Sequence, residues 1–501
     1  MNAEHIYGCC EAKYKVVCEY NMDGNGTLNW KRVYSPASVA WTGLGMLCVL
    51  YLVAYADRLV LGLLVDPIKI SLHITDVQIG FLMGPAFTVF YGIVGLPIAL
   101  LADTGNRRRL VIAGVFFWGS CTLATSFAET FWLFVILRIG LAVGEAVLTP
   151  TAMSLIADWF SPRKRAVPAT TYMWSGQMGG ILGVAGLALL VREVVEKQVL
   201  REFPLFSSFL PWQIVFFFLG GGTILLGLIA IIVFREPNRV EALAGSVEED
   251  LTVDNKSDLS QSVSFVLRHS RIYIGVIVGG SLNSVLLGAF AVWGVQLIHR
   301  NYGWAISDAG FVIGGAYVTG AVAGFMTVSF VILPKLMKRL DDRRGASHGL
   351  IYGAMASSLV GNLLLAFAAV APSSQLFLAL TAMGIATVYL SALLPSIALP
   401  IIAPPRMRAF VSAINVFVVS AVALSLGPIL APLFAKLWFS GFGERALSWG
   451  IFACGIWLPL ITIPLLSWAR RPFTAVMSAQ LGYTTGQRVE GIPSSNPSLV
   501  T

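Results

Sequence analysis

Residues 137–146, with the sequence LRIGLAVGEA, place two charged side chains inside an apolar segment. The segment runs over about residues 131–157, which is long enough to cross a bilayer as a helix. An ionisable side chain at that depth costs roughly a few kcal/mol, so it normally faces a wet cavity or a charged partner. Arg138 and Glu145 are separated by about two helical turns, or about 10 Å along the axis, on nearly the same face. The stretch therefore predicts a membrane helix that carries a charged functional site.

The composition of the whole chain is that of a helical membrane protein. Of the 501 residues, 56% are hydrophobic and 12% are charged, with a mean hydropathy of +0.77, whereas soluble domains carry about 25% charged residues. About twelve apolar runs are long enough to span a bilayer. They cover roughly residues 39–65, 77–101, 110–127, 131–157, 166–191, 212–234, 272–298, 309–333, 349–370, 376–402, 410–434 and 446–468. We expect an all-α membrane protein with twelve transmembrane helices.

A polar stretch over residues 235–261 divides the apolar runs into two equal sets. We predict a cytoplasmic tail over residues 1–38 and two six-helix bundles over residues 39–234 and 271–469. A cytoplasmic linker over residues 235–270 would join the bundles, and a second cytoplasmic tail would cover residues 470–501. Two bundles that rock about a site at the midplane are the layout of a secondary transporter working by alternating access.

Basic clusters fall in alternate loops of this layout. They lie at residues 107–109, 163–165, 343–344, 406–408 and 470–471. This positive-inside pattern predicts that both termini lie in the cytoplasm of a cell membrane, or of the inner membrane in a bacterium. Although the net charge is +8, no basic stripe lies on a soluble domain, so no nucleic-acid partner is predicted. The expected partners are membrane lipids and a substrate, and we expect a monomer.

The other charged pair inside an apolar run is Asp57-Arg58. Asp57 and Arg138 each lie about eight residues from the outer end of their oppositely running segments, so both sit at a similar depth. A nearby cation favours a charged carboxylate, and desolvation favours a neutral one. Displacing an arginine, or bringing an anionic substrate to it, would therefore let a carboxylate take a proton. We expect proton chemistry among Asp57, Arg58, Arg138 and Glu145; the alternative is a static buried ion pair.

The second apolar run ends in a carboxylate, Asp103, followed by a basic cluster that includes Arg107 and Arg108. At a cytoplasmic helix end such a group can pair with a neighbouring helix and form a latch that breaks when the bundles rearrange. This loop resembles the signature loop of the major facilitator superfamily, Gly-x-x-x-Asp-Arg-x-x-Arg-Arg. Ala99 replaces the first glycine and Thr104 replaces the arginine after Asp103, which predicts a weaker latch.

Four stretches together resemble the spinster family within that superfamily. They are Tyr55-Ala56-Asp57-Arg58, Phe117-Trp118-Gly119-Ser120, Arg138 with Gly144-Glu145-Ala146, and Ile156-Ala157-Asp158-Trp159-Phe160. The resemblance implies a proton-linked or facilitated carrier of amphipathic lipids, such as sphingosine phosphate and lysophospholipids. It also implies that Asp57 and Glu145 are the proton-titrating carboxylates, with Arg58 and Arg138 as their charge partners or headgroup contacts.

The substrate stays open between two classes. Symporters of small organic anions in the same superfamily also carry Asp-Arg in the first segment and Arg…Glu-Ala in the fourth, so a sugar acid or an aromatic carboxylate is the alternative. In the second half the spans carry no charged residue near mid-membrane, which suits a substrate with an anionic head and an apolar body. The residues expected to line the cavity are Tyr55, Asn283, Trp293, Tyr389 and Asn415.

The sequence shows no pattern of an enzyme or an ATP-driven pump. It contains no P-loop, no Cys-x-x-Cys pair, and no cluster of histidine and cysteine with metal-ligand spacing. It also lacks the repeated filter expected of a channel. We therefore expect neither catalysis nor a metal or other cofactor, and protons are the predicted coupling ion.

Overall fold

A computed structural model describes residues 18–22, 28–32, 35–161, 164–204, 206–237, 264–332, 346–402 and 408–484. Within these ranges the chain is helical apart from one antiparallel hairpin of β1 (Cys18–Met22) and β2 (Leu28–Arg32). Nine of the described helices are long and apolar enough to cross a membrane. The predicted all-α membrane fold is confirmed, and the helices follow one another at the positions of the predicted spans. Most of the predicted linker and of both predicted tails lies outside the described residues.

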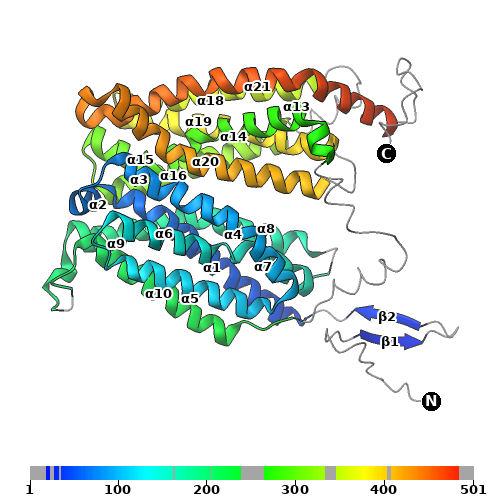
Figure 1. Ribbon diagram of the computed structural model, residues 1–501, viewed down its shortest axis with the longest axis horizontal. Helices are drawn as coiled ribbons and strands as arrows, with labels where there is room; N and C mark the ends of the chain where they lie inside the picture. The colour runs from blue at the N-terminus through cyan, green and yellow to red at the C-terminus, as the bar shows by residue number, and fades with distance from the viewer. Residues whose placement is uncertain are drawn as a thin grey trace. The chain divides into compact units, whose positions relative to one another are not determined.

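The first compact unit contains the described residues up to 237 together with Val292–His299 and Gly303–Gly314. Its helices lie side by side along one direction (Figure 1). They are α1 (Ala37–Leu63), α2 (Val65–Leu72), α3 (Asp76–Met83), α4 (Pro85–Thr104), α5 (Arg107–Thr125), α6 (Phe131–Glu145), α7 (Leu148–Trp159), α8 (Ala166–Met178), α9 (Val184–Val191) and α10 (Pro211–Val233), with shorter π or 3-10 turns η2 (Gly179–Gly183), η3 (Arg192–Glu196) and η4 (Val199–Glu202). A core that includes Trp118, Trp159 and Tyr172 fills the space between them.

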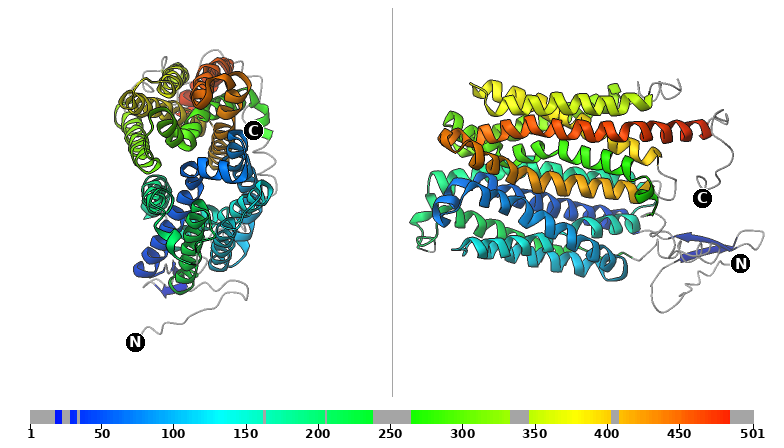
Figure 2. Two further views of the ribbon diagram at one scale, coloured as in Figure 1. Left: turned by 90° about the vertical axis from the view of Figure 1, so that its left-hand side faces the viewer. Right: turned by 45° about the horizontal axis from the view of Figure 1, so that its top comes forward.

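The second compact unit contains the other described residues from 264 onward. Its helices also run side by side (Figure 2). They are α13 (Ser270–Tyr273), α14 (Gly279–Asn283), α15 (Val285–Tyr302), α16 (Ile306–Met326), α18 (Ala346–Ala369), α19 (Ser374–Ile402), α20 (Arg408–Trp438) and α21 (Ala446–Thr484), with turns η5 (Ile274–Val278), η6 (Thr327–Ile332) and η8 (Ser440–Arg445). Helices α15 and α16 contribute residues to both units. Helix α21 continues past the predicted end of its apolar run because Phe473 packs into a core cluster with Ile272 and Tyr273.

Close backbone packing fixes the position of α1, the helix that carries Asp57. A Cβ atom on Gly179 would lie 2.4 Å from the carbonyl oxygen of Leu52, and one on Gly183 would lie 2.5 Å from the Cβ of Ala56. Only glycine allows α1 and the π-helical turn η2 to approach this closely. The side of α1 that bears Leu52 and Ala56 is therefore held against η2.

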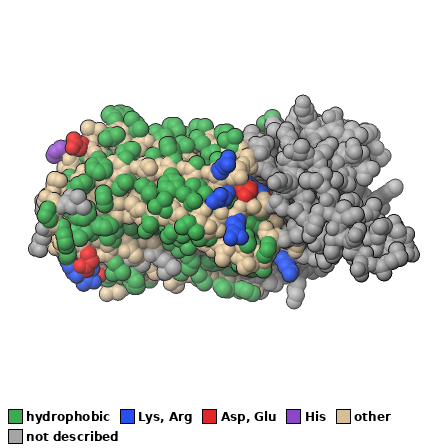
Figure 3. Space-filling model, turned by 90° about the horizontal axis from the view of Figure 1, so that it is seen from below, with side chains coloured by type: hydrophobic (Ala, Val, Ile, Leu, Met, Phe, Trp, Pro, Cys, Tyr) green, Lys and Arg blue, Asp and Glu red, His purple; other side chains and the backbone are tan. Residues whose placement is uncertain are grey.

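One face of the protein has the side-chain distribution expected in a bilayer. In Figure 3 hydrophobic side chains are spread over the described part of this face, and charged side chains gather at the two ends of that part. A lipid-facing surface is apolar, while the polar ends reach the interfaces. This distribution agrees with a protein whose helices span the membrane.

Candidate functional site

The structure brings the four charged residues of the first and fourth predicted spans into one cluster between α1 and α6. Arg58 Nε lies 2.6 Å from Glu145 Oε2, which is an ion pair. Arg138 donates hydrogen bonds to the backbone oxygens of Asp57 at 3.4 Å and Arg58 at 3.0 Å. Asp57, Arg138 and Glu145 are all buried. Two carboxylates and two guanidiniums thus share a site with no formal net charge.

The carboxylate of Asp57 accepts a hydrogen bond from a neutral side chain. Thr122 on α5 donates its hydroxyl to Asp57 Oδ2 at 2.6 Å, and both residues are fully buried. Arg138 bonds the backbone beside this carboxylate. Thr122 could not be identified from the sequence, because a single threonine in an apolar run can satisfy its hydroxyl on its own helix.

Three aromatic rings surround the guanidinium of Arg58. Its central carbon lies 4.9 Å from the centroid of Tyr55 and 4.8 Å from the centroids of both Phe87 and Tyr91. Cation–π attraction of this kind strengthens when the cation is desolvated. Tyr55 was predicted to line the cavity, whereas Phe87 and Tyr91 on α4 were missed; their spacing of one helical turn is the signal in the sequence.

The cluster retains unused hydrogen-bonding capacity. Among the described residues, Asp57 Oδ1, Glu145 Oε1, Arg58 Nη2 and Arg138 Nε are buried and have no hydrogen-bond partner. An unpaired buried polar atom costs about 1–3 kcal/mol, so proteins rarely leave four together. The two carboxylate oxygens can accept a proton, and the two guanidinium nitrogens can donate a hydrogen bond to a water molecule or to a polar group of a substrate.

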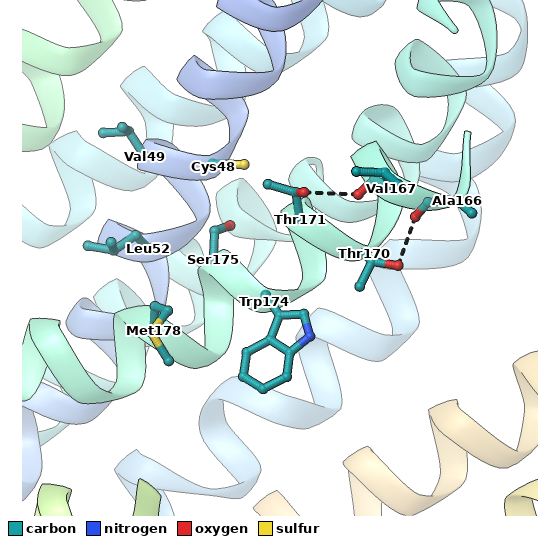
Figure 4. A pocket seen from close by; sticks show the side chains of 10 residues that line it. All are labelled: Cys48, Val49, Leu52, Ala166, Val167, Thr170, Thr171, Trp174, Ser175 and Met178. Atoms are coloured by element: carbon teal, nitrogen blue, oxygen red, sulfur yellow. Dashed lines mark hydrogen bonds between the residues drawn. The ribbon is translucent and has the colours of Figure 1, made fainter. Parts of the chain in front are cut away.

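A cavity of about 710 Å³, open to the surface, lies between α1 and α8. Its α1 residues come before Asp57 on the chain, and its α8 residues come after Glu145. Figure 4 shows its lining. The lining residues are Cys48, Val49, Leu52, Ala166, Val167, Thr170, Thr171, Trp174, Ser175 and Met178. Its three hydroxyl groups donate to carbonyls of their own helix at 2.6–2.9 Å, so they present mainly carbon to the cavity. Leu52 and Arg58 lie on the same helix, about 9 Å apart along its axis.

The predicted latch arginines are engaged, with partners that were not predicted. Arg107 forms an ion pair with Asp158 at the end of α7 and another with Glu236, whose Oε1 lies 2.9 Å from Arg107 Nε. The backbone N–H of Arg108 donates to Glu236 Oε2 at 2.6 Å. The side chain of Asp103 lies outside the described part of the structure. Asp158 follows the apolar run over residues 131–157, and Glu236 follows the run over residues 212–234. A carboxylate just after an apolar run is usually a solvated residue at a helix end, so the sequence does not mark either one as a partner of Arg107.

The remaining predicted lining residues are spread along the second half of the chain. Asn283 is buried in the second unit and accepts a hydrogen bond from Asn362 Nδ2 at 2.6 Å. Asn415 is also buried there, and Tyr389 is half-buried. Trp293, in the segment that belongs to the first unit, is fully buried. Their contact with a substrate stays a prediction.

The described helices are those of a multi-pass membrane protein, and a cluster of charged side chains lies within them. Residues 47–428 match the model of the Major Facilitator Superfamily. The chain therefore belongs to the Major Facilitator Superfamily, and family and fold point to a transporter and not to an enzyme.

Several relatives share part or most of the chain. An MFS-type efflux pump of Mycolicibacterium smegmatis is 26% identical over 82% of this chain and 87% of the pump. The sphingosine-1-phosphate transporter SPNS2 of Xenopus tropicalis is 33% identical over 31% of this chain and 29% of that protein. A probable galactarate/D-glucarate transporter, GudP, of Escherichia coli is 25% identical over 61% of this chain and 68% of that protein.

A solved structure extends the similarity to the fold. The crystal structure of a bacterial homologue of the human lysosomal transporter Spinster, in an inward-facing and unoccupied conformation, aligns with a TM-score of 0.67 at 20% identity. The alignment covers 91% of this chain and all of that chain. The predicted resemblance to the spinster family within the superfamily is confirmed.

Proposed function

We propose that this protein is a proton-coupled secondary transporter that moves an amphipathic anion of the sphingolipid or lysophospholipid type by alternating access. Two six-helix bundles, over residues 39–234 and 271–469, would alternate about the charge cluster as a monomer. The protein would lie in the cell membrane, or the inner membrane of a bacterium, with both termini in the cytoplasm. The observation that carries the proposal is the ion pair of Arg58 Nε and Glu145 Oε2, 2.6 Å apart, because Arg58 lies on α1, the helix that also lines the apolar cavity.

Charge balance supports the coupling of an anion to a proton. The cluster is neutral when both carboxylates are ionised and both arginines are charged. An anionic headgroup that takes the place of Glu145 on Arg58 leaves a carboxylate that is fully buried. Binding one proton to Glu145 at that moment keeps the cluster neutral, which avoids the cost of an unpaired buried charge. Asp57, bonded by Thr122, is the second carboxylate that can take a proton.

The cavity between α1 and α8 supports the apolar part of the substrate. Its volume of about 710 Å³ is in the range of drug-sized ligand sites. Leu52 lines it, and Arg58 follows about 9 Å along α1 and about a third of a turn around the helix, so an apolar chain from a headgroup at Arg58 would pass partly around α1 to reach the cavity. The similarity to a sphingosine-1-phosphate transporter agrees with such a substrate.

A small organic anion is the second candidate substrate, supported by the similarity to a probable galactarate/D-glucarate transporter. Such a substrate would use the two arginines without the apolar cavity. The two candidates therefore differ in whether filling the cavity prevents binding.

A thermal-shift experiment on the purified protein distinguishes the candidates. Ligands that bind the folded state raise its melting temperature. We expect sphingosine phosphate and lysophosphatidic acid to stabilise the wild-type protein, and Ser175→Trp, which fills the cavity, to remove that shift. Ile136→Trp, at an exposed position on α6 that does not line the cavity, is the matched control. Stabilisation by glucarate alone, unchanged in Ser175→Trp, would support the organic-anion alternative and contradict the lipid proposal.

A further inference from the structure

The hydroxyl of Thr122 has an unusual acceptor for a threonine in these helices. Many other described helix threonines donate to a carbonyl one turn back on their own helix, at 2.7–3.0 Å. They include Thr88, Thr125, Thr170, Thr223 and Thr387. Thr122 instead donates across to Asp57 on α1, at 2.6 Å. This hydrogen bond joins α5 to α1 within a fully buried site.

The surroundings of Asp57 make this hydroxyl its main hydrogen-bond donor. Arg58, on the same helix, pairs with Glu145, and Arg138 from α6 bonds backbone oxygens. From α5, the half-buried thiol of Cys121 also faces Asp57. Helix α10, which packs against α1, carries no charged residue. The charge of Arg138 and the indole of Trp118 on α5 also act on the Asp57 carboxyl, and within the described residues Thr122 is the neutral side chain that donates a hydrogen bond to it.

We infer that Thr122 is a positioning residue for proton binding at Asp57, with two hydrogen-bonded states. When Asp57 is charged, Thr122 donates to it and joins α5 to α1. When Asp57 binds a proton, its O–H can donate to Thr122, and the threonine proton can turn to the carbonyl of Trp118 one helical turn back, as in the other threonines. This inference rests on the proposed function, which assigns a proton to Asp57.

Each state keeps every hydrogen of the pair satisfied, which is the condition for a proton site in a dry environment. In the first state the threonine hydroxyl stabilises the anion. In the second it gives up that bond without leaving an unpaired donor. Proton binding would thus change the hydrogen bond between α1 and α5 without moving any charged side chain of the cluster.

Infrared titration of the substrate-free protein in liposomes tests this inference, with protons as the only ligand. The carboxyl band of protonated Asp57 is identified as the band that Asp57→Asn removes. Because Thr122 donates to the charged form, Thr122→Val should move the midpoint of that band to higher pH by about one to two units. Thr122→Ser, which keeps the hydroxyl, should titrate close to wild type.

Thr125→Val is the matched control, since Thr125 lies one turn away on α5 and donates to Cys121. Thr122→Ala replaces Thr122→Val if the valine variant does not fold. A wild-type midpoint in both Thr122→Val and Thr122→Ala, or an equal shift in Thr125→Val, would overturn the role of Thr122. If no titrating band disappears in Asp57→Asn, the assignment of a proton to Asp57 fails instead, and the inference fails with it.

Discussion

The guanidinium of Arg58 and the carboxylate of Glu145 form an ion pair that joins α1 to α6, with 2.6 Å between Nε and Oε2. The carboxylate is fully buried, and the guanidinium side chain is 13% exposed. A buried pair of this kind can simply hold two helices together, or it can be broken and remade during transport. Because removal of both charges leaves neither one unpaired, a double substitution separates these two roles.

Glu145→Gln alone should lower the free energy of unfolding by about 3–5 kcal/mol, because it leaves Arg58 buried without its anion. The double variant Arg58→Gln, Glu145→Gln should recover most of this stability, as measured by thermal unfolding in detergent. Uptake of sphingosine phosphate driven by a pH gradient in proteoliposomes should remain absent in the double variant. Uptake at the wild-type rate would show that the pair is structural.

The contacts of Arg107 predict unequal effects at its two carboxylate partners. Asp158 is buried and Glu236 is 24% exposed on its side chain. Since solvent screens the more exposed pair, Asp158→Asn should lower the melting temperature more than Glu236→Gln. Glu193→Gln removes one partner of the exposed pair with Lys197 and should leave the melting temperature unchanged. Equal decreases in the melting temperature of Asp158→Asn and Glu236→Gln would contradict the greater burial of the ion pair between Arg107 and Asp158.

Glycine packing between η2 and α1 gives a prediction with its own control. A Cβ atom on Gly183 would lie 2.5 Å from that of Ala56, whereas one on Gly186 would meet nothing within 4 Å. Gly183→Ala should therefore destabilise the protein by about 1–3 kcal/mol through overpacking, and Gly186→Ala should not. Thermal unfolding of both variants measures this difference. Similar melting temperatures would mean that η2 can move away from α1 at no cost.

The charged part of the site could be predicted from the sequence because charges stand out against apolar runs. Asp57, Arg58, Arg138 and Glu145 each carry an insertion cost that needs a functional or structural reason. Their pairing could not be predicted, since the distance from a membrane surface gives depth but not the rotation of each helix. The structure shows that Arg58, and not Arg138, forms the ion pair with Glu145.

The neutral residues of the site could not be predicted, because they do not stand out against an apolar run as charged residues do. Thr122, Phe87 and Tyr91 carry no charge, so apart from the one-turn spacing of the two rings nothing distinguishes them from packing residues in an apolar run. The break in the fourth predicted span has a signal that the hydropathy does not show. The predicted span over residues 131–157 is divided after Glu145 into α6 and α7, and Pro150 cannot donate a backbone hydrogen bond to Ala146 there.

The start of α16 offers a last prediction. Both oxygens of the Glu196 carboxylate accept hydrogen bonds from Ser307, one from its backbone N–H and one from its hydroxyl, each at 3.1 Å. The first N–H groups of a helix have no acceptor within the helix, and a carboxylate there is worth about 1 kcal/mol. Glu196→Ala should therefore speed hydrogen exchange of the backbone amides at the start of α16 by about fivefold.

Glu193→Ala, one turn earlier in η3 and paired only with Lys197 in the described contacts, is the control and should leave that exchange unchanged. Mass spectrometry of a peptide covering residues 303–312 measures both. Unchanged exchange in Glu196→Ala would mean that the carboxylate does not hold this helix start, because water would then replace it without loss.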